Sequence, residues 1–150
     1  MREAGPVGQP HCQRKDKRGC QAGRVRGTLD KMRNDFLPGG SSCVLVVEDD
    51  PAIRLMAVDI LSDAGFETLE AGDAAQALEA LNKSEHKIDV LFSDLRMPGM
   101  NGLELALVAK RKHPQLRVIV TSGDYEKKLP PGAKFLAKPW CASDLLRVAA

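Results

Sequence analysis

The chain has 150 residues, of which 43% are hydrophobic and 28% charged, and its formal net charge is +2. This is the length of about one domain and the composition of a soluble globular protein, which excludes collagen-like, mucin-like and wholly disordered chains. No apolar run approaches the roughly 18 residues needed to span a bilayer, and the N-terminus lacks the apolar stretch of a secretory signal. We therefore expect a cytoplasmic protein without membrane contact.

The first 42 residues differ from the rest of the chain. They carry nine Lys and Arg against four Asp and Glu, whereas residues 43–150 carry thirteen against sixteen. Because Gly, Pro, Gln and Arg dominate and no hydrophobic period is sustained, we expect residues 1–42 to form a disordered basic extension, with at most a short helix over 28–36. Such a segment can bind nucleic acid, but a solvated tail is the simpler interpretation, and we expect no nucleic-acid partner.

The cysteines give no sign of a metal or disulfide framework. Cys12, Cys20, Cys43 and Cys141 lie far apart and lack the paired spacing of a zinc site. His11 with Cys12 and Cys20 offers three potential metal ligands, but no fourth is evident. Reduced thiols are the expectation.

Residues 43–150 predict a folded domain in which strands alternate with helices. Val44–Val47 is a β-branched run of the kind found in strands that are buried on both faces. Asp50 can cap a helix that has Pro51 in its first turn and ends at Gly65. In this helix Ile53, Met56, Ala57 and Ile60 recur at helical spacing.

The alternation continues to the end of the sequence. Further strands are predicted over 66–71, 88–93, 117–121 and 134–137. Further helices are predicted from a capping box at Asp73, after the loop that ends at Gly102, and over 143–148. In the helix that follows Gly102, Leu103, Ala106 and Leu107 are predicted to face inward.

This order of elements predicts an α/β fold with a doubly wound, five-stranded parallel sheet. The connection between the fourth and fifth strands has only about a dozen residues. Because Pro130-Pro131-Gly132 also interrupts it, we expect the helix of that connection to be degraded or absent.

Polar side chains follow four of the five predicted strands. Glu48-Asp49 follows the first strand, Asp94 the third, Thr121-Ser122 the fourth and Lys138 the fifth. Since ligands of open parallel sheets bind at the carboxyl ends of the strands, we expect these side chains to converge.

Three neighbouring carboxylates repel one another and are tolerated mainly where a cation neutralises them. Ligands that are all oxygen atoms indicate a hard ion. Mg²⁺ suits a site with few protein ligands and several retained waters, whereas Ca²⁺ needs a fuller cage. We therefore expect Mg²⁺, which would also keep Asp94 ionised.

Four segments of the sequence together resemble the receiver domains of two-component response regulators, such as the chemotaxis regulators. The segments are Val46-Val47-Glu48-Asp49-Asp50, Ser93–Gly102, Thr121-Ser122-Gly123 and Lys138-Pro139. The resemblance covers residues 43–150 and implies a flavodoxin-like sheet with strand order 2-1-3-4-5. The short connection after Ser122 is similar to a divergent receiver group in which the helix there is vestigial.

The resemblance implies a role for each matching residue. Asp94 would accept a phosphoryl group from a phosphohistidine of a sensor histidine kinase or a phosphotransfer protein. Asp49 and Asp94 would bind Mg²⁺ directly, Glu48 through water, and Arg96 through its backbone carbonyl. Lys138 would pair with a phosphoryl oxygen.

Switching is also implied by the resemblance. Ser122 would move to hydrogen-bond the phosphoryl group, Phe135 corresponds to the switch aromatic residue, and Lys138-Pro139 is a candidate cis peptide. Arg96 and Asp124 lie two residues after the acceptor and the switch serine, where their side chains would control access of water. The altered surface over the fourth and fifth strands would bind a downstream protein that the sequence does not identify.

Two other interpretations remain open. The chain could be a stand-alone receiver or a receiver fragment of a hybrid histidine kinase. An enzyme of a different class, the haloacid dehalogenase-type phosphatase, also uses an aspartate nucleophile and Mg²⁺, but it needs a second acid where this sequence has Arg96. We therefore expect a phosphoacceptor rather than an enzyme.

Overall fold

The computed structural model describes residues 42–83, 87–124 and 129–150, and within them five strands form one sheet. The strands are β1 (Cys43–Val47), β2 (Glu67–Ala71), β3 (Ile88–Asp94), β4 (Arg117–Ser122) and β5 (Lys134–Ala137). They pair in parallel in the order β2-β1-β3-β4-β5. The predicted fold class and strand order are therefore confirmed.

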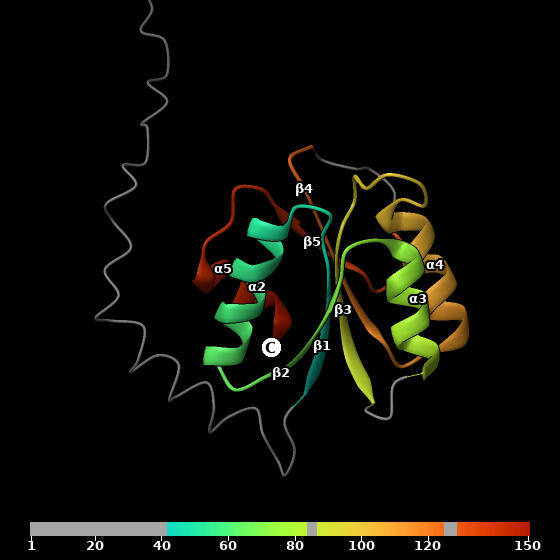
Figure 1. The fold of residues 1–150 in the computed structure, drawn as a ribbon, viewed down its shortest axis with the longest axis horizontal. Coiled ribbons are helices and arrows are strands. Elements are labelled where there is room, and N and C mark those ends of the chain that lie inside the picture. The colour runs from blue at the N-terminus through green and yellow to red at the C-terminus, as the bar shows by residue number, and fades with distance from the viewer. Residues whose placement is uncertain (1–41, 84–86, 125–128) are drawn as a thin grey trace, which may run out of the picture.

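Helices cover both faces of the sheet (Figure 1). The helices are α2 (Pro51–Asp63), α3 (Ala74–Lys83), α4 (Gly102–Lys112) and α5 (Ala142–Ala149). Helices α2 and α5 lie on one face and α3 and α4 on the other (Figure 1). None of the helices in the described ranges has the length and apolar character that crossing a membrane requires.

The central strand β1 explains why its sequence is apolar without alternation. All five of its residues are buried. Val44 and Val46 pack in the core under α2 and α5, whereas Leu45 and Val47 pack in the core under α3 and α4. A strand with helices on both sides has no face for polar residues, so it is held rigidly by two cores.

The helix ends follow the sequence signals closely. Asp50 caps α2 by accepting hydrogen bonds from the backbone amides of Ala52 and Ile53. At the start of α3, Asp73 Oδ1 accepts a hydrogen bond from the Gln76 amide, as in the predicted capping box. The Gln76 side chain, however, accepts from the amide of Gly72 and not from that of Asp73. The element boundaries agree with the predictions to within one or two residues, which is the range over which element ends fray.

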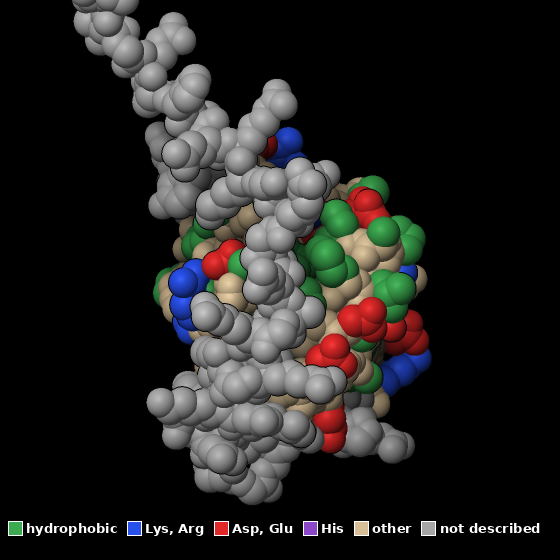
Figure 2. Space-filling view, turned by 90° about the vertical axis from the view of Figure 1, so that its left-hand side faces the viewer, with side chains coloured by type: hydrophobic (Ala, Val, Ile, Leu, Met, Phe, Trp, Pro, Cys, Tyr) green, Lys and Arg blue, Asp and Glu red, His purple; other side chains and the backbone are tan. Residues whose placement is uncertain are grey.

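One prediction about inward-facing residues is wrong, because Leu107 on α4 is 47% exposed. Met56, which shares the helical spacing noted for α2, is also exposed, at 46%. Small residues replace them on the buried faces, where Ala57 of α2 and Ala109 of α4 are buried and let the helices approach the sheet. On the side that carries α2 and α5, hydrophobic and acidic side chains lie beside one another on the surface (Figure 2).

The connection between β4 and β5 lacks a helix in the part that the structure describes, residues 123–124 and 129–133. Gly132 there has a positive φ of 79°. The predicted short helix at 28–36 and most of the predicted basic extension lie outside the described residues.

Gly102 lies where α4 begins against the end of β3. Its amide donates to the Leu95 carbonyl at 2.9 Å. A Cβ atom at this position would lie 2.3 Å from the Asp94 carbonyl oxygen and 2.9 Å from Leu95 Cα. The absence of a side chain therefore lets α4 pack directly against the backbone of Asp94.

We expect Gly102→Ala to destabilise the protein, because the atoms in the way are backbone atoms that cannot rotate aside, and overpacking of this kind costs about 1–3 kcal/mol. The roughly 1 kcal/mol that alanine gains over glycine within a helix offsets part of this cost, which leaves a net loss of up to about 2 kcal/mol. Urea denaturation measures the difference. Gly123→Ala is the matched control because a Cβ there meets nothing within 4 Å; equal stability of the two variants would contradict the prediction.

Candidate functional site

The register of the sheet brings the polar strand ends to one edge. Val47 of β1 pairs with Ser93 of β3, and Asp94 pairs with Thr121 of β4. The Lys138 amide donates to the Ser122 carbonyl at 2.8 Å, which continues the β4–β5 pairing. Residues that are far apart in the sequence therefore meet at the carboxyl edge of the sheet.

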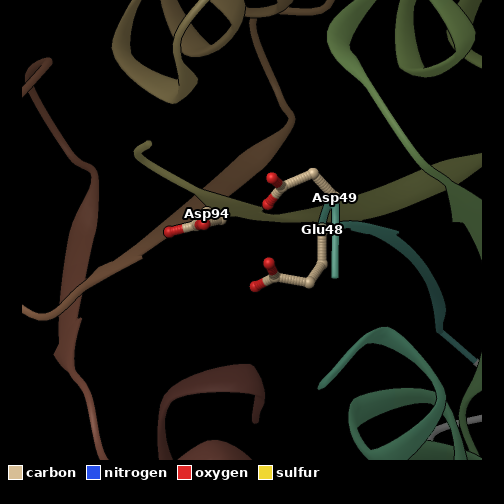
Figure 3. A group of neighbouring side chains, drawn as sticks. All are labelled: Glu48, Asp49 and Asp94. Carbon is tan, nitrogen blue, oxygen red and sulfur yellow. The ribbon is translucent and has the colours of Figure 1, made fainter. Parts of the chain in front are cut away.

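Three carboxylates gather at this edge. Glu48, Asp49 and Asp94 each offer a ligand oxygen, and these oxygens lie within 4.8 Å of one another. The side chains of Glu48 and Asp49 extend from the end of β1 towards the side on which Asp94 leaves β3 (Figure 3). Glu48 and Asp94 are buried, with side chains 2% and 8% exposed, whereas Asp49 is exposed.

Lys138 supplies the opposite charge. Its Nζ donates to Glu48 Oε2 at 3.0 Å and lies 3.3 Å from Asp94 Oδ1. Burial alone would lower the pKa of the Lys138 ammonium, but its hydrogen bond to Glu48 and the charges of Glu48 and Asp94 outweigh burial and raise that pKa. The ammonium therefore stays charged and links the ends of three strands.

Glu48 is the carboxylate of the cluster whose charged form is disfavoured by its surroundings. Burial, followed by the nearby Asp94 carboxylate, raises the pKa of Glu48 to about 7 even though Lys138 acts in the opposite direction. The backbone amide of Asp50 also donates to Glu48 Oε1 at 3.3 Å. One lysine is thus not enough to offset the burial of this carboxylate beside a second one.

The donor set fits a hard divalent cation. All three ligand atoms are carboxylate oxygens, and the mutual distances allow one ion to contact more than one of them. Three carboxylates against one ammonium leave an excess of negative charge that such an ion would neutralise. A small number of protein ligands favours Mg²⁺, which keeps several of its waters, over Ca²⁺, which needs a fuller cage.

Ser122 and Phe135 lie on β4 and β5, the two strands that follow β3 across the sheet. Ser122 is buried at the end of β4, and its Oγ accepts a hydrogen bond from the Asp124 amide at 3.2 Å. Phe135 is half-buried on β5, opposite Val120. The switching roles of both residues stay predictions. The Lys138-Pro139 peptide bond is cis, as predicted.

Arg96 and Asp124 form an ion pair that the sequence did not predict. The sequence selects both residues by their positions, and the structure joins Arg96 Nη2 to Asp124 Oδ2. Both side chains are exposed. The pair links the loop after β3 to the loop after β4, that is, the segments that follow Asp94 and Ser122.

Arg54 is a residue of the site that the sequence patterns did not select. Its guanidinium donates to the Glu48 carbonyl at 2.7 Å and bonds Glu70 at 3.3 Å. No local motif marks it. The only available signal is its place one turn into the helix that starts at the site.

Comparison with known proteins supplies independent information. The family model of the response regulator receiver domain matches residues 44–149. The sensor kinase CckA of Brucella abortus is 36% identical over 112 residues, which cover 71% of this chain but only 12% of that kinase. The chemotaxis protein CheY of Thermotoga maritima is 35% identical over 104 residues, which cover 65% of this chain and 85% of CheY.

A solved structure agrees with these matches. The receiver domain of the hybrid histidine kinase CckA superposes with a TM-score of 0.64 at 35% identity. The match covers 72% of this chain and 95% of that domain.

The raised pKa of Glu48 predicts how the stability of the metal-free protein depends on pH. The unfolded chain loses the Glu48 proton near pH 4.5, whereas the folded chain keeps it up to about pH 7. The contribution of this proton to the free energy of unfolding is therefore complete below pH 4.5 and is lost as the pH rises through 7. We expect the free energy of unfolding to fall between pH 5 and 8, by at most about 3 kcal/mol from this group.

Urea denaturation in a chelator at several pH values measures this dependence. Glu48→Gln has no proton to lose at this position, so its curve should lack that part of the fall. Curves of the same slope for both proteins would show that Glu48 does not titrate in this range.

Proposed function

The chain belongs to the response regulator receiver domain family, and from that premise we propose that it is the phosphoacceptor of a two-component phosphorelay. Asp94 would take the phosphoryl group. The observation that carries this proposal is that the Asp94 carboxylate lies 3.3 Å from Lys138 Nζ and within 4.8 Å of ligand oxygens of Glu48 and Asp49. An acceptor needs this combination of nucleophile and charge compensation.

The proposed transfer is a displacement at phosphorus. An oxygen of Asp94 attacks, the O–P bond forms, and the N–P bond of the donor phosphohistidine breaks so that the electron pair returns to the imidazole. Such transfer depends mainly on positioning and electrostatic stabilisation. Glu48, Asp49, Asp94 and the carbonyl of Arg96 would hold Mg²⁺, whose chemistry is to neutralise the charge of the phosphoryl oxygens.

Lys138 would contribute the second positive charge. In the unphosphorylated protein its Nζ is shared between Glu48 and Asp94. A phosphoryl oxygen on Asp94 would offer this ammonium a more highly charged partner. Ser122 would then exchange its hydrogen bond with the Asp124 amide for one to the phosphoryl group. Phe135, as the switch aromatic residue, would change its position together with Ser122.

The partners follow from the same proposal. A sensor histidine kinase or a phosphotransfer protein would supply the phosphoryl group, and a downstream protein would recognise the surface over β4 and β5. Phosphoryl transfer and binding of the downstream protein would both take place in the cytoplasm. The similarity to CckA supports a second arrangement, in which the receiver is part of a hybrid kinase.

A small phosphodonor with Mg²⁺ tests the acceptor. We expect one adduct of about 80 Da per chain, stable in acid and labile in base, that is absent in Asp94→Asn. Intact-protein mass spectrometry measures it. Asp59→Asn, which removes an exposed acid of α2, is the matched control and should load like the wild type. Release of many equivalents of phosphate would indicate a phosphatase instead.

The Arg96–Asp124 pair leads to a separate expectation. If it shields the phosphorylated site from water, Arg96→Ala and Asp124→Ala should load normally but lose the phosphoryl group several-fold faster. The double variant should decay no faster than the single ones, because either substitution removes the whole pair. Decay is followed by mass after removal of the donor, and wild-type rates in both single variants would refute the role.

A further inference from the structure

Arg54 connects two strand ends beside the carboxylate cluster. It lies in the first turns of α2, and its side chain is only 21% exposed. Nη1 donates to the backbone carbonyl of Glu48 at 2.7 Å, and Nε donates to Glu70 Oε2 of β2 at 3.3 Å. The guanidinium therefore braces the end of β1 against the end of β2.

The carbonyl that Arg54 contacts belongs to the peptide group between Glu48 and Asp49. On the other side, the Glu48 amide donates to the Ala71 carbonyl of β2 at 3.2 Å. Glu48 is thus held by β2 through its amide and by Arg54 through its carbonyl. These contacts set the direction in which the chain leaves β1, and hence where Asp49 begins.

Asp49 depends on this backbone more than its neighbours do. Glu48 and Asp94 are both held by Lys138. Asp49 is exposed, and within the described residues its carboxylate has no hydrogen bond or ion pair of its own. Its place in the cluster therefore rests on the peptide group that Arg54 fixes.

We propose that Arg54 is a positioning residue that holds the Glu48–Asp49 peptide so that the Asp49 carboxylate faces the cation site. This inference rests on the proposed function, since it concerns binding of Mg²⁺ to the same cluster. Arginine suits the task because its planar guanidinium bonds two acceptors at once, which a lysine ammonium on a flexible stem does less well. Removal of a residue that does not bind the metal but orients one of its ligands typically weakens metal binding 10–100-fold.

Electrostatics alone predicts the opposite effect, which makes the test decisive. Arg54 carries a positive charge near a cation site, so its removal should strengthen Mg²⁺ binding if charge were the only factor. Loss of positioning should weaken it. The sign of the change therefore separates the two explanations.

The experiment titrates MgCl₂ alone into the full 150-residue chain and follows the backbone amide signals by NMR. These spectra report both affinity and whether the fold is intact. We expect Arg54→Met to raise the Mg²⁺ Kd about 10-fold or more, with the metal-free spectrum still that of a folded protein. Arg54→Lys keeps the charge and should fall between that variant and the wild type.

Two further variants complete the test. Glu70→Gln keeps Arg54 but removes the negative charge of the side chain to which Arg54 bonds. It should raise the Mg²⁺ Kd by a smaller factor than Arg54→Met does. Arg147→Met removes an arginine of α5 that is 71% exposed and pairs with Asp144, and should leave the Kd unchanged.

The outcomes are distinct. An equal or lower Kd for Arg54→Met would overturn the positioning role while leaving the proposed function intact. If that variant does not fold, Arg54→Lys decides, because an unchanged Kd would then overturn the role and a raised Kd would support it. Failure of the wild-type chain to bind Mg²⁺ would overturn the proposed function and this inference with it.

Discussion

Repulsion among three carboxylates at one edge of the sheet is the constraint on which the site depends. Glu48, Asp49 and Asp94 lie within reach of one ion, and Lys138 is the cation that contacts two of them among the described residues. Burial, followed by the nearby Asp94 carboxylate, still raises the pKa of Glu48. The folded protein tolerates this arrangement because the strands that carry these residues are buried in two hydrophobic cores. The unfavourable electrostatic energy is therefore confined to one rigid edge of the sheet.

Much of this arrangement could be predicted from the sequence. The strands, the sheet order and the family are confirmed, and the acidic residues, Ser122 and Lys138 were located because each directly follows a predicted strand. A parallel sheet brings such positions together whatever the loops do. Topology and four short segments therefore predicted that these residues would converge, and their roles as site residues stay predictions.

The features that could not be predicted involve long side chains or close backbone contacts. Arg54, and Arg96 with Asp124, find partners across loops, and a flexible side chain has several acceptors within its reach until the fold is known. Gly102 looks like an ordinary glycine before a helix, and only the approach of α4 to Asp94 shows why it has no side chain. Leu107 and Met56 matched a helical period but lie on exposed faces, because alanines occupy the places nearest the sheet.

Under the proposed function, the contacts around Ser122 describe what phosphorylation would have to displace. In this structure Ser122 Oγ accepts from the Asp124 amide, and Asp124 pairs with Arg96 on the surface. A neutral hydrogen bond contributes about 1 kcal/mol and an exposed ion pair about 0–1 kcal/mol. A phosphoryl group offers oxygens that form charge-assisted hydrogen bonds of about 1.5–3 kcal/mol each. One such bond to Ser122 would match or exceed these two contacts, so a single modification could displace them and shift the population of the two arrangements.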